Sequence, residues 1–431
     1  MNVFFSDPWW LILIKVVALF VILLVWTIFN VWYERRLVGK MQHRLGPIMN
    51  GPFGLGQALA DGAKLIAKED FRPTNTDKWV FNLAPLLTGV AAFTTWTVMP
   101  FGGKVEIFGV STRLQVTDLP VSVLFVIAIA SIGIYGIVLA GWASNSTYSF
   151  LGSIRSSAQM ISYEVAMGLA IVGVFVLSGS MSTASIVEAQ SKEIILRVPF
   201  VPGMEFNPGI PGWYGLLLLP SFVIYCIAMV GETNRAPFDL PECESELVAG
   251  YLTEYSGFRY AMYFLAEYIN MATVSAVATT LFLGGYLPPW PLNLIPFLNN
   301  PWFGPIFFFI KVQLLISGFV WLRGTLPRFR YDQFMDLGWK RLIPISLLWI
   351  VMIGIAPQYT LGLAVLLVAI LIALSGTTDK ADEEDDVDLD EPFDAFAGGY
   401  PVPPRPGQML PEMAGVVRAP STDDTEVGVE N

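Results

Sequence analysis

The sequence predicts an all-α fold, a polytopic membrane helical bundle followed by a polar tail. The chain is 54% hydrophobic and only 14% charged, which is typical of a multi-spanning membrane protein. Its apolar residues gather in runs close to the roughly 20 residues that a helix needs to cross a bilayer. Its net negative charge comes from the C-terminal segment, because residues 379–431 hold fifteen acids and three bases. The remaining residues are therefore almost neutral.

Nine apolar runs are candidates for spanning helices. The last two are separated by Pro357, and a proline disfavours helix continuation, so two short spans are favoured over one long helix. We therefore expect nine spans, with eight as the alternative. The runs lie at 9–29, 80–99, 120–142, 159–178, 213–232, 261–283, 305–322, 342–356 and 360–375.

The distribution of lysine and arginine predicts the orientation of these helices. Four alternate loops hold sixteen of them and the other loops hold four, and the richer loops face the cytoplasm. We therefore expect a multi-pass protein of a bacterial plasma membrane with its N-terminus outside. The tail is then cytoplasmic with nine spans and external with eight. The richer loops are 30–79, 143–158, 233–260 and 323–341.

Other segments are expected to lie outside the spans. Residues 55–69 alternate apolar and polar positions at a helical spacing, which predicts an amphipathic helix on the membrane surface. Ser182 to Leu196 could form a short capped helix, and the Pro- and Gly-rich residues 197–212 form a loop. We divide the chain into a membrane domain, 1–378, and a disordered acidic tail, 379–431.

Seven carboxylates lie between Gly231 and Glu267, with only Arg235 and Arg259 as counterions. Carboxylates crowded near hydrocarbon repel one another and must share protons, which suits proton handling. Arg235 could pair with one of the acids beside it. Each acid could instead pair with an arginine or cap a helix. The seven are Glu232, Asp239, Glu242, Glu244, Glu246, Glu254 and Glu267.

Three acids fall inside predicted spans near the same side of the membrane. Glu164 and Glu267 lie about five or six residues into their spans, roughly 8–9 Å deep, and Glu232 closes another span. We expect these three to converge in one hydrated patch that opens toward the cytoplasm. The acids of the following loop, Glu242, Glu244 and Glu246, would then form its mouth.

Basic residues follow the first span. Arg35, Arg36 and Arg44 could be orientation signals that hold lipid headgroups. They could equally line the mouth of a cavity that admits a long isoprenoid molecule from the bilayer, beside the amphipathic helix.

Several kinds of bound group are not expected in this chain. Its two cysteines, Cys226 and Cys243, lack iron–sulfur spacing, and its single histidine, His43, argues against haem and zinc. We expect no bound metal, flavin or iron–sulfur cluster, so any electrons arrive from another polypeptide. The sequence has no large basic patch, so we expect no nucleic-acid partner.

Four segments carry a resemblance to a known family. They closely resemble the quinone-site membrane subunit of respiratory complex I, the proton-pumping NADH:quinone oxidoreductase (the H subunit in bacteria, subunit 1 in mitochondria). The resemblance runs from about residue 9 to 356. The segments are ERRLVGKMQHRLGP at 34–47, GLGQALADGAKLIAKED at 54–70, GETNRAPFDLPECESELVAGYLTEYSG at 231–257 and FRYDQFMDLGWK at 329–340.

The resemblance implies roles for the matching positions. Quinone, ubiquinone or menaquinone, would be the substrate, and other membrane subunits, iron–sulfur and flavin subunits and lipids would be the partners. Arg235 and Asp239 match the loop that faces the quinone chamber, and Tyr268 stands beside Glu267 as in the family. The chamber and its entrance correspond to Arg35, Arg36, Gln42, Arg44, Asp61 and Lys64. The acidic funnel corresponds to Glu164, Glu232, Glu242, Glu244, Glu246, Glu254 and Glu267.

These observations predict a membrane protein that couples quinone reduction to proton translocation but carries no redox centre itself. A component of a membrane-bound hydrogenase-type complex, a proton-coupled transporter and a passive anchor between soluble and membrane arms are the alternatives. The acidic tail has no counterpart in the short members of the family.

Overall fold

The structure is a computed structural model that describes residues 7–192, 196–197, 205–206, 211–239 and 249–375. It divides into two units, Met1–Leu367 and Val368–Asn431, and the described residues of the second are the last turns of one helix. The predicted disordered tail lies outside the described residues. The predicted all-α fold is confirmed, apart from two small hairpins. The expected boundary at residue 378 stays a prediction.

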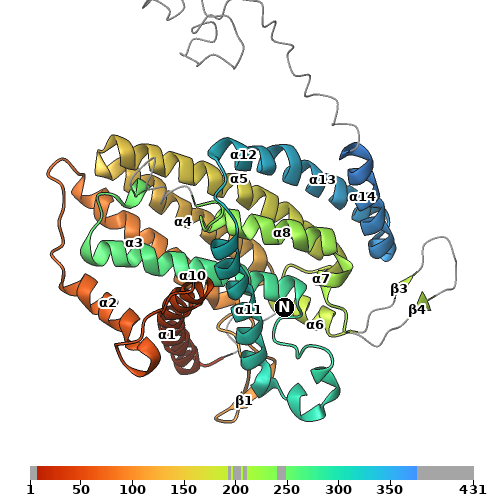
Figure 1. Ribbon diagram of the computed structural model, residues 1–431. Coiled ribbons are helices and arrows are strands. Elements are labelled where there is room, and N and C mark those ends of the chain that lie inside the picture. The colour runs from red at the N-terminus through yellow and green to blue at the C-terminus, as the bar shows by residue number, and fades with distance from the viewer. Residues whose placement is uncertain (1–6, 193–195, 198–204, 207–210, 240–248, 376–431) are drawn as a thin grey trace, which may run out of the picture. The chain divides into compact units, whose positions relative to one another are not determined.

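The predicted apolar runs all form helices in the described part of the chain (Figure 1). Six helical segments are long and apolar enough to cross a membrane, so the count of nine spans stays a prediction. The helices are α1 (Trp9–Met41), α3 (Lys78–Thr94), α4 (Ser122–Ser144), α5 (Thr147–Ser178), α8 (Leu219–Glu232), α10 (Gly257–Phe282), α11 (Gly304–Thr325), α13 (Ile343–Ile355) and α14 (Thr360–Ser375).

The fifth run, expected to be one span over 213–232, is broken. It forms α7 (Tyr214–Leu217) and α8, and Leu218 between them leaves helical geometry at φ −110° and ψ 46°. Pro220 causes the break, because a proline lacks an N–H and its ring clashes with the preceding turn of a helix. The eighth run is extended instead, by α12 (Tyr331–Asp336) and a π-helical turn, Leu337–Leu342.

The short elements agree partly with expectation. The amphipathic helix forms as α2 (Gly56–Ala67), and Ser182 caps a helix that ends earlier than expected, α6 (Thr183–Gln190). The loop expected over 197–212 includes one strand of a hairpin, β3 (Leu196–Arg197) with β4 (Glu205–Phe206). A second unexpected hairpin joins β1 (Lys104–Ile107) to β2 (Val110–Arg113). Its turn, Phe108-Gly109, has positive φ at both residues, which suits a two-residue hairpin.

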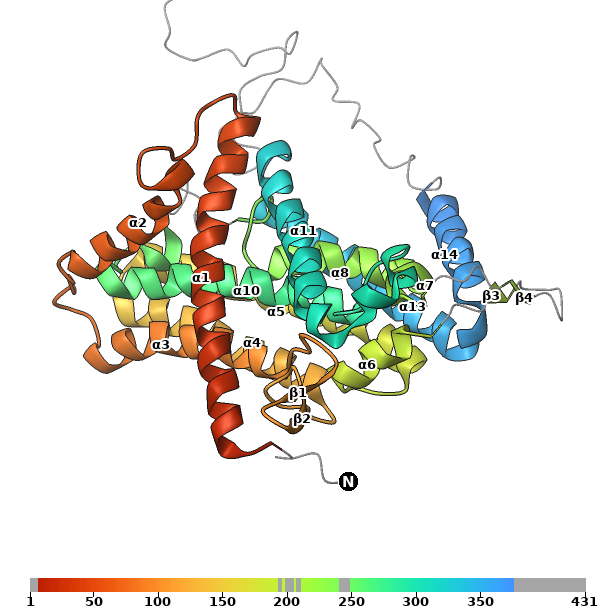
Figure 2. The ribbon, with the colours of Figure 1, turned by 90° about the horizontal axis from the view of Figure 1, so that it is seen from below.

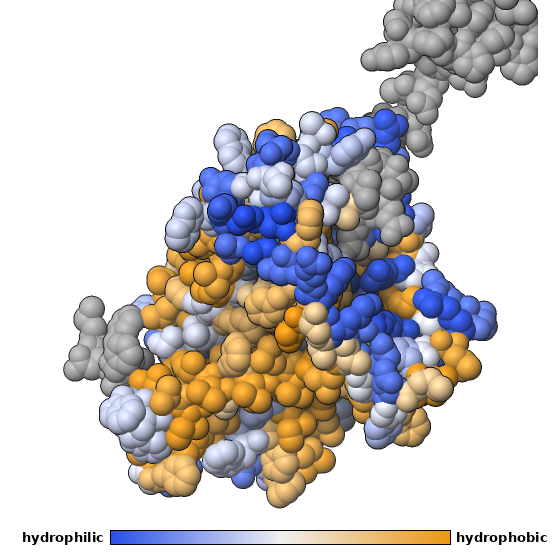
Figure 3. All heavy atoms as spheres, turned by 90° about the vertical axis from the view of Figure 1, so that its left-hand side faces the viewer, coloured by the Kyte–Doolittle hydropathy of each residue, from blue (hydrophilic) through white to orange (hydrophobic). Residues whose placement is uncertain are grey.

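Helix α10 joins two sets of packed helices in the first unit, through its contacts with α3 and with α11. Helices α3, α4 and α5 pack in sequence, and α5 also contacts α8 and α13. Helices α1, α10 and α11 contact one another, and α1 crosses α10 steeply (Figure 2). One face of the molecule shows a wide hydrophobic area beside a hydrophilic region (Figure 3). Exposed Leu13, Val17 and Val21 of α1 and Leu86 of α3 are the kind of side chain that faces lipid.

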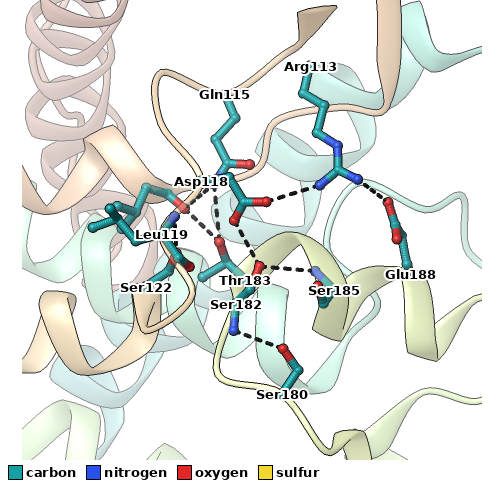
Figure 4. A network of polar contacts seen from close by, with 11 residues as sticks. Arg113, Gln115, Asp118, Leu119, Ser122, Ser180, Ser182, Thr183, Ser185 and Glu188 are labelled. Carbon is teal, nitrogen blue, oxygen red and sulfur yellow. Dashed lines mark hydrogen bonds and ion pairs between the residues drawn. The ribbon is translucent and has the colours of Figure 1, made fainter. Parts of the chain in front are cut away.

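A polar network holds the β1–β2 hairpin against α6 (Figure 4). Arg113 forms ion pairs with Asp118 at 3.1 Å and with Glu188 at 2.7 Å. Ser182 donates a hydrogen bond to Asp118 at 2.8 Å, so the cap of α6 is itself held by the network. Lys15 of α1 reaches the same hairpin through Thr112 and the Arg113 carbonyl. These contacts join the N-terminal half of α1, the hairpin and α6.

Candidate functional site

The site is centred on Arg235, in the loop that follows α8. Asn234 reverses the chain there in the left-handed region, at φ 51°. Gln159 of α5 fixes the loop by donating to the carbonyls of Gly231 and Phe238, both at 2.7 Å. The side chain of Arg235 is thereby directed into the protein, where only 8% of the residue is exposed.

Arg235 joins two carboxylates from different helices. Its Nη1 lies 3.2 Å from Oε1 of Glu34 on α1, and its Nε lies 2.8 Å from Oε1 of Glu267 on α10. The second contact is an ion pair without hydrogen-bond geometry, and Nη2 finds no hydrogen-bond partner in the described chain. Burial lowers the pKa of Arg235, but Glu267 and Glu34 outweigh it and hold the pKa well above its ordinary value. Arg235 is therefore a permanent cation shared by two acids.

Glu34 is the second centre of the cluster. It was not predicted from the sequence as a site residue, whereas the neighbouring arginines were. It is 5% exposed, accepts a hydrogen bond from the Tyr268 hydroxyl at 2.6 Å and forms an ion pair with Arg323 of α11. The guanidinium of Arg235 also lies over the Tyr268 ring, 4.4 Å from its centroid. A signal for Glu34 is present in the sequence, because Thr27, Asn30 and Glu34 share one face of an apolar helix.

A cavity of about 40 Å³ lies beside this cluster. It is lined by three of the predicted acids, Glu232, Asp239 and Glu267, together with polar groups that include Asn234. Oε2 of Glu232 is buried and has no hydrogen-bond partner among the described residues. Asp239 pairs with Arg328 at 3.2 Å. A space of this size with polar lining groups has room for an ordered water, and three of the predicted acids line it.

Two of the other predicted acids lie within the described residues, and neither lines this cavity. Glu164 lies in the contact of α5 with α4, where Ser131 donates a hydrogen bond to it, and it does not line the cavity. Glu164 lies on the α4 side of α5, so its expected convergence with Glu232 and Glu267 in one patch stays a prediction. Its charge still acts on Glu232. Glu254 is half-buried in the turn before α10. Glu242, Glu244 and Glu246 lie outside the described residues.

The predicted entrance residues gather where α1 ends and α2 begins. Arg35 forms an ion pair with Asp61 of α2, whose second oxygen accepts from Gln57 at 3.0 Å. Arg36 donates to the Phe53 carbonyl at 3.0 Å and lies over the rings of Trp32 and Phe53.

The segment between these helices closes tightly on itself. A Cβ at Gly54, where φ is 79°, would lie 2.2 Å from the Pro47 carbonyl oxygen, so only glycine fits. Arg44 donates to Gln42 at 2.7 Å, and Lys64 is exposed on α2. The two clusters are linked through α1, because Glu34 of the buried cluster precedes Arg35 and Arg36 of the entrance.

Comparison with known proteins identifies the family of the chain. The H subunit of NADH-quinone oxidoreductase from Cutibacterium acnes is 59% identical over 428 residues, covering 96% of this chain and 95% of that protein. The protein of the same name from Streptomyces avermitilis is 47% identical and covers 95% of this chain and 90% of that protein. The one from Frankia alni is 55% identical over 351 residues, with coverages of 81% and 74%.

The first match is long enough to include most of the acidic tail, so that relative has a counterpart for it. The family described as NADH dehydrogenase matches residues 14–354, which include every described residue of the two clusters. The chain belongs to the NADH dehydrogenase family.

Proposed function

We propose that this chain is the quinone-site membrane subunit of a proton-translocating NADH-quinone oxidoreductase. Its family and the names of its relatives support this function over a hydrogenase-type complex or a transporter. Electrons reach the quinone from flavin and iron–sulfur subunits, and this chain supplies part of the quinone chamber. It lies in a bacterial plasma membrane with its N-terminus outside.

The pairing of Arg235 with both Glu34 and Glu267 carries the proposed coupling. Quinone reduction changes the charge near Arg35, Arg36 and Asp61, and Glu34 directly precedes the two arginines on α1. A shift of Glu34 toward Arg323 weakens its pair with Arg235, and Arg235 then holds Glu267 more tightly. The protonation of Glu267 and of its cavity neighbours Glu232 and Asp239 follows that exchange, a local electrostatic event with a distant result.

The remaining predicted residues extend this path in our proposal. Gln42, Arg44 and Lys64 complete the entrance. Glu242, Glu244, Glu246 and Glu254 bring protons from the cytoplasm, and Glu164 passes the change of charge along α5. The chain itself holds no metal, flavin or iron–sulfur cluster in this proposal. Its tail lies in the cytoplasm.

Photolabelling by a quinone analogue tests this function in the intact complex. During turnover we expect label in the peptides that contain Arg35 to Lys64, and excess unlabelled quinone should remove it. Flavin and iron–sulfur subunits should copurify with the chain, which separates this enzyme from a hydrogenase-type complex. Label confined to other subunits under turnover would show that this chain only anchors them.

A further inference from the structure

The contact of α1 with α11 contains polar side chains along its length. Trp26 donates from Nε1 to Gln313 Oε1 at 2.9 Å, and the hydroxyls of Tyr33 and Ser317 share a hydrogen bond of 2.9 Å. The ion pair of Glu34 with Arg323 closes the row at the end nearest the site. The two helices therefore form a polar seam between hydrophobic surfaces.

Asn30 faces the interior of this seam. Successive residues of a helix turn by about 100°, so Asn30 points between the directions of Trp26 and Glu34. Trp26 contacts α11, and Glu34 contacts α11 through Arg323 and α10 through Tyr268. Asn30 is 2% exposed, so its side chain is enclosed by protein on this face of α1.

Two buried polar atoms of the seam have no hydrogen-bond partner in the part of the chain that the structure describes. They are the acceptor Oδ1 of Asn30 and the donor Nε2 of Gln313. Leaving such groups unpaired costs about 1–3 kcal/mol each, and ordered waters commonly bind the buried polar groups that lack a protein partner. One water molecule between the helices can accept a hydrogen bond from the donor and donate one to the acceptor.

Aromatic rings shield the seam from lipid. Trp26 packs edge-on against Trp96 and Phe309, with ring centroids 5.7 Å and 4.9 Å apart. Tyr33 stacks with Phe29 at 5.9 Å. These rings therefore separate the space between Asn30 and Gln313 from the bilayer. A lipid acyl chain would not satisfy the two polar atoms, because it has no hydrogen-bonding group.

We propose that an ordered water binds in the α1–α11 seam, accepting from Gln313 Nε2 and donating to Asn30 Oδ1. It continues the polar contacts of Glu34 toward the middle of α1. Asn30 and Gln313 are then positioning residues, which act on Glu34 through the packing and polarity of the seam. The water site follows from the seam alone, whereas its effect on turnover rests on the proposed function.

A map of the intact complex at a resolution that shows waters tests the site directly. The parent should show density within hydrogen-bond distance of both atoms, Asn30→Leu should lose it, and Asn30→Ser should retain it. We expect Asn30→Leu to lower kcat for quinone reduction about fivefold with KM unchanged, and Asn30→Ser to restore most of the rate.

Each failure has a distinct meaning. A parent map without this density, or with the two amides bonded to each other, overturns the water site. Density that behaves as expected while Asn30→Leu and Asn30→Ser turn over equally overturns the positioning role. A parent complex that contains the water but does not reduce quinone contradicts the proposed function alone.

Discussion

Helix α10 meets a buried cation at its C-terminal end and another in its N-terminal half, and the two are held differently. At the C-terminal end, Lys311 of α11 is 9% exposed and lies over Trp213, 4.3 Å from the ring centroid. Its ammonium donates three hydrogen bonds, an ammonium's full complement, to backbone carbonyls that follow the helix. They belong to Leu283 at 2.6 Å, Gly285 at 3.0 Å and Leu287 at 2.7 Å.

Arg235 has no such fixed set of partners. It is shared by Glu34 and Glu267, and Glu34 is shared in turn by Arg235 and Arg323. A cation bound to carbonyls has one arrangement, because carbonyls do not change charge. A cation between two carboxylates can be redistributed, because protonation of either acid leaves the cation paired more strongly with the other. The comparison separates a structural cation from one that can transmit a signal.

Replacing Arg235 should have the largest effect. Arg235→Met leaves two buried carboxylates without their shared cation, and breaking such a pair costs about 3–5 kcal/mol. We expect quinone reductase activity to fall at least about a hundredfold, measured with inhibitor-sensitive assays and native gels that report assembly. Arg235→Lys keeps the charge without the two-sided contact and should be intermediate. Full activity of assembled Arg235→Met would show that the two carboxylates do not need their shared cation.

Replacing Lys311 tests the other side of the comparison. Lys311→Met leaves three carbonyls at the end of α10 without donors, so we expect the complex to lose about 3 kcal/mol of stability. Turnover per assembled complex should remain unchanged, because the carbonyls take no part in proton exchange. Thermal dissociation and turnover of the purified complex are the measurements. Normal stability with lost proton pumping would reverse the roles of the two cations.

Sequence patterns predict the helices and single out three acids that line the cavity, for a physical reason. Apolar runs of the length of a bilayer can hardly form anything but helices, because lipid offers the backbone no hydrogen bonds. The acids of 231–267 are close in sequence to a helix end, so their meeting at Glu232, Asp239 and Glu267 requires no long-range information. The same locality explains the loop around Arg235.

Pairings across the bundle cannot be predicted in this way. Glu34 meets Arg235, 201 residues away, and Arg323, 289 residues away. Which acid pairs with Arg235 depends on the angle at which α1 crosses α10. The hydrophobic periodicity of the sequence does not predict that angle. The direction of Glu164 around α5 is equally hidden, and it carries this acid to Ser131 instead of the cavity.

Neutralising Glu267 should weaken the exchange without removing the cation. Glu267→Gln leaves Glu34 as the one carboxylate of the described residues paired with Arg235, so we expect assembly to survive and kcat to fall about tenfold, with fewer protons pumped per electron. Glu164→Gln is the matched control, since it makes the same change to an acid outside the cavity. It should also impair pumping but retain more of the reductase rate. Normal proton-to-electron ratios in both variants would contradict the funnel.

Tyr268→Phe should have the smallest effect of the substitutions at Arg235 and its direct partners. It removes the hydroxyl that donates to Glu34 at 2.6 Å but keeps the aromatic ring beneath Arg235. One hydrogen bond to a buried carboxylate is worth about 1.5 kcal/mol, so kcat should fall about tenfold at most, with normal assembly. In the double variant Tyr268→Phe, Glu267→Gln, the loss of kcat should be smaller than the two single losses combined, if both residues act through Arg235. Additive losses would mean that Glu34 and Glu267 respond to quinone separately. Arg235 would then have a structural role, as Lys311 does.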